Sequence, residues 1–207
     1  VPLASAIDQD KSFSAPMARF NDAKGQNHFT SACCVMVYRD DFIGTDFANN
    51  IFVCEPVHNL VHREVLQPMG VTFRSKRTED EKTSEFLASM DNWSRFTSTR
   101  AGPDGALYIV DMYRLVIEHP KWIPEEWQRQ LGDLRAGSTM GRIYRLRPKG
   151  SVLRPVPQLD GAELPVLVAA LQSPSGVVRD LAQQQLVWRP DGGHDDARGL
   201  LPALSDG

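Results

Sequence analysis

Short apolar runs separated by tight turns make up the first half of the chain. They lie at residues 32–38, 50–54, 59–66 and 71–74, and the breaks between them carry Asp, Gly and Pro. Runs of this length that are rich in β-branched and aromatic residues predict β-strands. Four strands within about 45 residues match the size of one four-stranded propeller blade.

A second set of strands follows, at 93–99, 106–111 and 141–147. The turn Gly102-Pro103-Asp104-Gly105 separates the first two, and Pro103 and the glycines suit it. The segment 112–140 is too long for a hairpin loop, and Pro124 to Trp127 predicts a short helix within it. We therefore expect residues 31–148 to form about two four-stranded blades of a β-propeller, with 112–140 as a long insertion.

Beyond residue 148 the apolar positions take a helical spacing. Residues 149–162, with Pro155 and Pro157, predict a linker. Helices are predicted at 164–171, with a proline in the first turn, at 177–188, and from Leu200 onward. Paired short helices are typical of α-solenoids, so 163–207 predicts the start of a HEAT-like repeat. The fold class is therefore mainly β with a C-terminal α segment, after an irregular stretch at 1–30.

Composition excludes several classes of protein. The 207 residues are 42% hydrophobic and 24% charged, with a net charge of -3, as in a folded protein. There is no basic excess to neutralise phosphates, so no nucleic-acid partner is expected. No apolar run approaches the roughly 20 residues of a transmembrane helix. The chain begins with Val1 rather than Met, and its last residues, 205–207, come just after a helix-like apolar run. We therefore expect it to be a piece of a longer protein.

Two groups of residues suggest metal or redox chemistry by type, although a structural role is favoured for both. His58 and His62 are four apart, and on a strand they would lie about 13 Å apart, too far to share a metal. Cys33, Cys34 and Cys54 are an odd set that forms no disulfide framework. Cys33 and Cys34 would be reactive only if exposed with a lowered pKa, and a Cys34–Cys54 bridge is possible if their strands pair.

Four runs carry a resemblance to a known family: FVCEPVHNLVHREVL (52–66), GPDGALYIVDMYR (102–114), IEHPKWIP (117–124) and LRAGSTMGRIYRL (134–146). They resemble the planctomycete-type membrane-bound dehydrogenases, which are related to quinoprotein glucose/sorbosone dehydrogenases. The resemblance implies a β-propeller followed by HEAT-like repeats. It further implies a periplasmic or other extracytoplasmic location and oxidation of a sugar or alcohol. Electrons would pass to a c-type cytochrome domain, whose haem lies outside this chain.

The resemblance also suggests which residues would serve pyrroloquinoline quinone and Ca²⁺ in the parent protein. A quinone with three carboxylates needs arginines, which bind carboxylates bidentately. We assign cofactor binding to Arg114, Arg135, Arg142 and Tyr113, catalysis to His119 and Glu118, and the metal to Asp104 and Asp111. His119 would act as base and Glu118 would orient it.

Less specific interpretations stay open. Turns of the Asp104 type are common in propeller blades and need no metal. A salt-bridged network of Arg114, Glu118 and Arg135 would equally fix the insertion to the propeller. A non-catalytic propeller and HEAT scaffold that binds protein or polysaccharide is the main rival function. A calcium-dependent propeller hydrolase is a third, and it requires an acidic metal cage. The fragment alone is expected to be inactive, since a propeller site needs blades from the whole ring.

Overall fold

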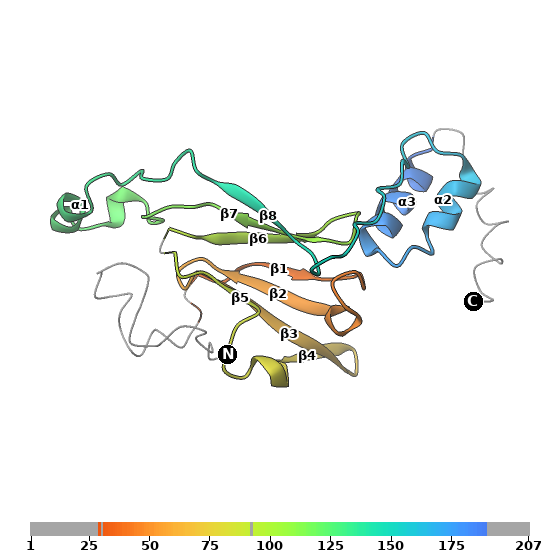
Figure 1. The fold of residues 1–207 in the computed structure, drawn as a ribbon, viewed down its shortest axis with the longest axis horizontal. Coiled ribbons are helices and arrows are strands. Elements are labelled where there is room, and N and C mark those ends of the chain that lie inside the picture. The colour runs from red at the N-terminus through yellow and green to blue at the C-terminus, as the bar shows by residue number, and fades with distance from the viewer. Residues whose placement is uncertain (1–28, 30, 92, 190–207) are drawn as a thin grey trace. The chain divides into compact units, whose positions relative to one another are not determined.

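A computed structural model describes residues 29, 31–91 and 93–189 (Figure 1). Within these residues the chain divides into two compact units. The first, called the sheet unit, takes the chain up to Val37 together with Asn50–Arg100 and Tyr108–Arg145. The second, called the helical unit, takes Tyr38–Asn49, Ala101–Leu107 and the chain from Leu146. The predicted irregular stretch at 1–30 and the third helix from Leu200 lie, apart from Phe29, outside the described residues.

The first sheet contains five strands. They are β1 (Cys33–Val37), β2 (Asn50–Glu55), β3 (Leu60–Met69), β4 (Thr72–Lys76) and β5 (Leu87–Ala88). The order is β1-β2-β3-β4, each neighbour antiparallel, and β5 pairs with the start of β3. The four predicted strands are present as β1 to β4. The two-residue β5 was not predicted, because so short a run has no readable period.

The second sheet contains three described strands, β6 (Phe96–Ala101), β7 (Leu107–Asp111) and β8 (Arg142–Leu146), in that order. The two antiparallel sheets thus hold five and three strands, rather than the predicted four each. The first strand begins at Phe96 rather than Trp93, because side chains take the preceding N–H groups. The Trp93 N–H donates to Asp91 and the Arg95 N–H donates to Asp111.

Three α-helices and three 3₁₀ turns complete the described chain. The α-helices are α1 (Glu125–Leu131), α2 (Leu164–Ala170) and α3 (Gly176–Trp188). The 3₁₀ turns are η1 (Thr45–Phe47), η2 (Glu79–Glu81) and η3 (Pro120–Trp122). All three α-helices match predicted positions, and Pro165 occupies the first turn of α2 as expected. No helix of the described residues is long and apolar enough to span a bilayer.

Three successive polar or charged residues of β3 are buried: His62, Arg63 and Glu64. His62 and Glu64 lie on one face of the strand, and the His62 Nε2 is 3.2 Å from Glu64 Oε1. The other ring nitrogen, Nδ1, is 2.7 Å from Glu85 Oε2. Arg63 forms an ion pair with Glu81 at 2.9 Å. The polar and charged side chains of β3 are therefore buried together with hydrogen-bonding or ionic partners, which reduces the penalty of removing them from water.

A small apolar core joins α2 and α3 in the helical unit. Its buried members are Leu159, Leu167, Val168, Val178, Ala182 and Leu186. Leu167 of α2 is almost fully buried, whereas Val166 beside it is half exposed. Residues spaced at helical intervals thus form one apolar face on each helix.

Replacing Leu167 by Ala should destabilise the helical unit by about 2–4 kcal/mol, because it removes buried carbons and leaves a cavity. Val166→Ala is the matched control on the same helix and should change stability by about 0.5 kcal/mol or less. Urea unfolding followed by circular dichroism measures both. Equal effects of the two substitutions would contradict the assigned core.

Candidate functional site

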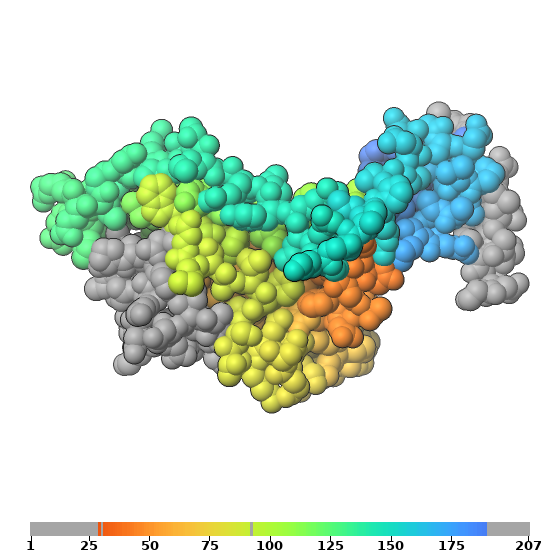
Figure 2. Space-filling model, viewed as in Figure 1, coloured from red at the N-terminus to blue at the C-terminus, as the bar shows by residue number. Residues whose placement is uncertain are grey.

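The segment 112–140 connects β7 to β8 and forms a small packed lobe with η3 and α1 (green in Figure 2). Val116 and Ile123 are buried there, and Leu115, Trp127, Leu131 and Leu134 pack against them. Trp122 is 69% exposed, so Trp127 rather than Trp122 contributes to this core. The insertion therefore has structure of its own, as its length predicted.

Asp111 ends β7, and its carboxylate is completely buried. Its Oδ1 accepts hydrogen bonds from the backbone N–H groups of Arg95 (2.7 Å) and Tyr113 (2.9 Å). Its Oδ2 accepts from the Ser94 hydroxyl at 3.1 Å and lies 3.5 Å from Arg142 Nε. Protein donors thus surround both oxygens of this carboxylate.

Arg114 holds the far end of the insertion through backbone carbonyls. Its guanidinium donates to the carbonyls of Gly137 and Ser138, the latter at 3.2 Å. Gly137 has a φ of +90°, and a Cβ there would lie 2.3 Å from the Tyr113 carbonyl oxygen. This close approach requires glycine, and it brings the Gly137 carbonyl within reach of Arg114.

Tyr113 and Arg142 stack on one another beside Asp111. The Arg142 guanidinium carbon lies 3.6 Å from the centre of the Tyr113 ring, a cation–π contact. Tyr113 adopts a φ of +52°, a left-handed conformation that turns the chain sharply after β7. These two predicted cofactor residues therefore come together with Asp111 and Arg114, at the base of the insertion.

The predicted catalytic pair lies apart from that base. His119 is exposed, and its Nδ1 accepts a hydrogen bond from the Lys121 N–H at 3.2 Å, which caps η3. Glu118 is half-buried. Burial lowers the pKa of Arg95, and the charge of Glu118 opposes that shift in part. Arg135 is exposed, and its N–H donates to Asp133. The Nδ1 of His119 is therefore taken up by the backbone N–H group that it caps.

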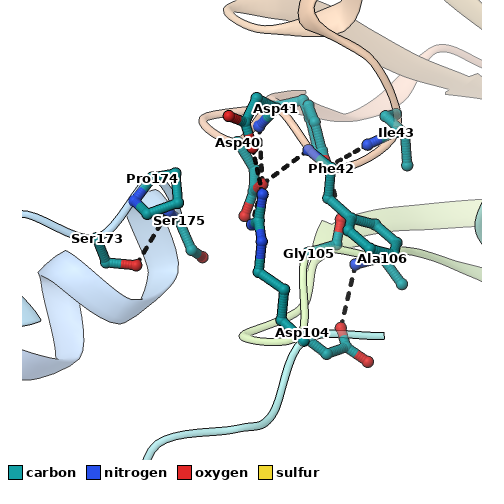
Figure 3. A network of polar contacts seen from close by, with 12 residues as sticks. Asp40, Asp41, Phe42, Ile43, Asp104, Gly105, Ala106, Ser173, Pro174 and Ser175 are labelled. Carbon is teal, nitrogen blue, oxygen red and sulfur yellow. Dashed lines mark hydrogen bonds and ion pairs between the residues drawn. The ribbon is translucent and has the colours of Figure 1, made fainter. Parts of the chain in front are cut away.

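Asp104, the second predicted metal ligand, belongs to the helical unit and lies in the Gly102–Gly105 turn. Its Oδ1 accepts a hydrogen bond from the Ala106 N–H at 3.1 Å (Figure 3). Gly105 has a φ of +87°, and a Cβ there would lie 2.4 Å from that of Phe42. The residues form the tight turn that the sequence predicted, with Asp104 bonding to the backbone.

These residues do not suit Ca²⁺ or a quinone carboxylate. Calcium takes six to eight oxygen ligands, but the oxygens of Asp111 are already occupied by N–H and O–H donors. No group of three or more His, Cys, Asp or Glu side chains in the described part of the chain is placed to hold a metal. Arg114 is committed to carbonyls and Arg142 to Tyr113, and Arg135 is exposed at the surface.

Arg95 is the main residue of this region that the sequence analysis missed. Its side chain is 4% exposed, and burial lowers the pKa of the guanidinium, while the charges of Glu118, Asp111 and Asp91 oppose that shift. It donates to four acceptors: the carbonyls of Pro56 (3.2 Å), Arg114 (3.0 Å) and Leu115 (3.1 Å), and Asn59 Oδ1 (2.7 Å). The one sequence signal was an arginine placed directly before Phe96, the first residue of β6.

Residues 3–150 match the family model of a domain of unknown function, DUF7133. The chain belongs to the DUF7133 family. No curated protein and no solved structure matches it. The DUF7133 match includes both sheets, the insertion and Arg95, and it ends before α2.

Replacing Arg95 in the DUF7133 region by Met should destabilise the sheet unit by about 3 kcal/mol or more, because four acceptors lose their donor. Arg95→Lys should cause an intermediate loss, since one ammonium group cannot reach all four acceptors. Arg74→Met, at an exposed position of β4, is the control and should stay within about 0.5 kcal/mol. Denaturant unfolding measures all three, and a neutral Arg95→Met would contradict the assigned role.

The helical unit has a buried phenol at Tyr38, which donates to the Gly105 carbonyl at 2.5 Å. Burial raises the pKa of Tyr38 from 10.0 to about 12, although the Ile43 N–H bond to its oxygen opposes the shift. Folding therefore favours the protonated phenol. The contribution of this raised pKa to the free energy of unfolding is complete below about pH 10 and is lost as the pH rises through about 12.

Tyr38→Phe should accordingly be less stable than the wild type at neutral pH, and the difference should shrink as the pH rises from about 10 to 12. Thermal melts of the two proteins over this range measure the difference. A difference that stays constant across the range would contradict the hydrogen-bonded, protonated phenol.

Proposed function

We propose that the two sheets are neighbouring blades of a β-propeller and that α2 and α3 begin a HEAT-like repeat. β1 to β4 in the first sheet and β6 to β8 in the second lie next to one another in chain order, as in a blade. The innermost candidates, β1 and β6, contact each other, since the Cys33 thiol donates to the Thr97 carbonyl at 3.5 Å. α2 and α3 share one apolar core, as paired helices of a solenoid do.

We infer that this chain contributes structure rather than the reacting groups. One observation carries this inference: the carboxylate of Asp111 and the guanidinium of Arg114 are both taken up by neighbouring groups of the fold. A catalytic acid, base or cofactor ligand needs a lone pair or donor directed to a ligand. Here these groups hold the insertion at the end of β7.

For the parent protein we propose an extracytoplasmic, quinoprotein-like dehydrogenase that oxidises a sugar or alcohol and passes electrons to a c-type cytochrome domain. Support comes from the four motif runs at 52–66, 102–114, 117–124 and 134–146, all of which fall within the DUF7133 match. Pyrroloquinoline quinone would supply the hydride-accepting chemistry there. In this proposal the cofactor binds to parts of the parent outside the residues described above.

The rival is a non-catalytic scaffold, and a feature of α3 favours it. Leu181, Val187 and Trp188 are exposed on this helix, and they line a shallow groove with Val177, Asp180, Gln183 and Gln184. An exposed apolar helix face is typical of solenoids, which bind other helices or a partner there.

The structural role predicts that the 207-residue chain does not bind pyrroloquinoline quinone saturably, with or without Ca²⁺, in equilibrium dialysis. Arg114→Ala should lower the melting temperature, because the carbonyls of Gly137 and Ser138 lose their donor. Arg135→Ala, at an exposed position in the same segment, is the matched control and should leave it unchanged. Saturable quinone binding that Arg114→Ala abolishes would contradict the structural role.

The parent activity is tested separately, with a longer protein that includes the sequence upstream of this chain. Quinone and Ca²⁺ are added, and dye reduction is followed with a panel of sugars and alcohols. Substrate-dependent reduction supports the dehydrogenase. A folded longer protein that binds neither quinone nor haem favours the scaffold.

A further inference from the structure

Three cysteines meet on the sheet unit, and the proposed function uses none of them. Cys33 and Cys34 lie on β1, Cys54 lies on β2, and all three thiols are free. The strands do pair, and the register places Cys33 rather than Cys34 opposite Cys54. β6 lies next to this group and supplies its polar contacts (Figure 1).

A backbone irregularity explains why two successive cysteines point to the same neighbour. Side chains of consecutive strand residues normally alternate between the two faces. Cys34 has a φ of +50°, and the register of β1 shifts between Cys33 and Met36, as in a β-bulge. As a result Cys33 Sγ contacts Thr97 of β6 and Cys34 Sγ contacts Ser98 and Thr99 of the same strand.

The surroundings of Cys34 favour its thiolate. Its Sγ lies 2.8 Å from Arg100 Nη1 and 3.1 Å from the Ser98 hydroxyl oxygen, and the residue is partly exposed. Burial acts to raise the pKa of Cys34, but the donors Ser98 and Arg100 outweigh it, so the pKa is lowered. Partly exposed thiols beside a cation are the reactive ones.

Cys33 and Cys54 differ from Cys34 in that burial favours their protonated thiols, so they compete poorly with Cys34 for the oxidant. Burial raises the pKa of both, that of Cys54 to about 12. Residues directly opposite in an antiparallel pair have Cα atoms about 4.5 or 5.5 Å apart. Both separations fall within the range of about 4.4–6.8 Å that a disulfide spans.

We propose that Cys34 is the entry thiol of a three-cysteine disulfide-exchange site whose oxidised form is a Cys33–Cys54 disulfide. The oxidant is a low-molecular-weight disulfide. This inference is independent of the proposed dehydrogenase and scaffold functions, because it rests on β1, β2 and β6 alone.

The exchange balances in three steps. The Cys34 thiolate attacks the oxidant, forms a mixed disulfide and releases one half of the oxidant as a thiolate. The Cys54 thiol loses its proton to water and attacks the Cys34 sulfur, which releases the second half. Cys33, deprotonated in turn, attacks the Cys54 sulfur, which forms Cys33–Cys54 and restores the Cys34 thiolate. Two protein thiols are oxidised and one disulfide oxidant is reduced to two thiols.

The test treats the reduced 207-residue chain with one equivalent of dithiobis(nitrobenzoate), a symmetric disulfide whose released thiolate half is coloured. The wild type should release both halves and retain no adduct, and acid-quenched peptide mapping should find Cys33 joined to Cys54. Cys54→Ala should release one half and keep the other on Cys34. Retention of an adduct by the wild type, or a final bridge that includes Cys34, would overturn the proposal.

The entry role is tested by rate. Cys34→Ser, a change at a partly exposed position, should abolish the fast release, and circular dichroism should report an unchanged fold. Arg100→Gln should slow it about threefold to tenfold at neutral pH and move the midpoint of the pH–rate profile upward, because the thiolate loses its cation. Arg74→Gln is the matched control on exposed β4 and should do neither. A fast phase that survives Cys34→Ser, or an unmoved profile in Arg100→Gln, would overturn the assignment.

Discussion

The sheet unit depends on one buried guanidinium. Arg95 joins the turn after β2, through Pro56 and Asn59, to the first residues of the insertion, through Arg114 and Leu115. A buried charge without partners is strongly unfavourable, so these four acceptors have to stay in place once Arg95 is buried. The planar fork of donors on arginine is what allows one side chain to serve acceptors from two separate segments.

Asp111 complements this arrangement from the end of β7. Its carboxylate accepts a hydrogen bond from the backbone N–H of Arg95. The Arg95 side chain in turn donates to the carbonyl of Arg114, three residues after Asp111. The chain turns between them at Tyr113, whose positive φ is supported by the hydrogen bond from its N–H to Asp111. The carboxylate of Asp111 and the guanidinium of Arg95 both have structural partners. Their residue types alone therefore say little about catalysis. A similar principle applies to β3, where His62 lies between two carboxylates.

The cysteine group shows how backbone conformation decides side-chain chemistry. An ideal strand would place Cys33 and Cys34 on opposite faces of the sheet. The irregularity at Cys34 directs both to β6, and Arg100 on that strand then donates a hydrogen bond to the Cys34 sulfur. Neighbouring thiols with different surroundings acquire different nucleophilicity, which is the requirement for ordered exchange.

The sequence by itself determined the local elements of this protein and several turns. Apolar runs and their spacing located β1 to β4 and the helices α2 and α3, and the Gly and Pro positions located the Asp104 turn, because these depend on residues close along the chain. Only the tertiary structure decided which side chains meet. Arg95 bonds to Asn59, Asp111 to Ser94, and Cys33 stands opposite Cys54 because strand register brings together residues far apart in sequence. Residue type shows that a group can donate, accept or ionise, but its partners decide whether that capacity serves the fold or a ligand.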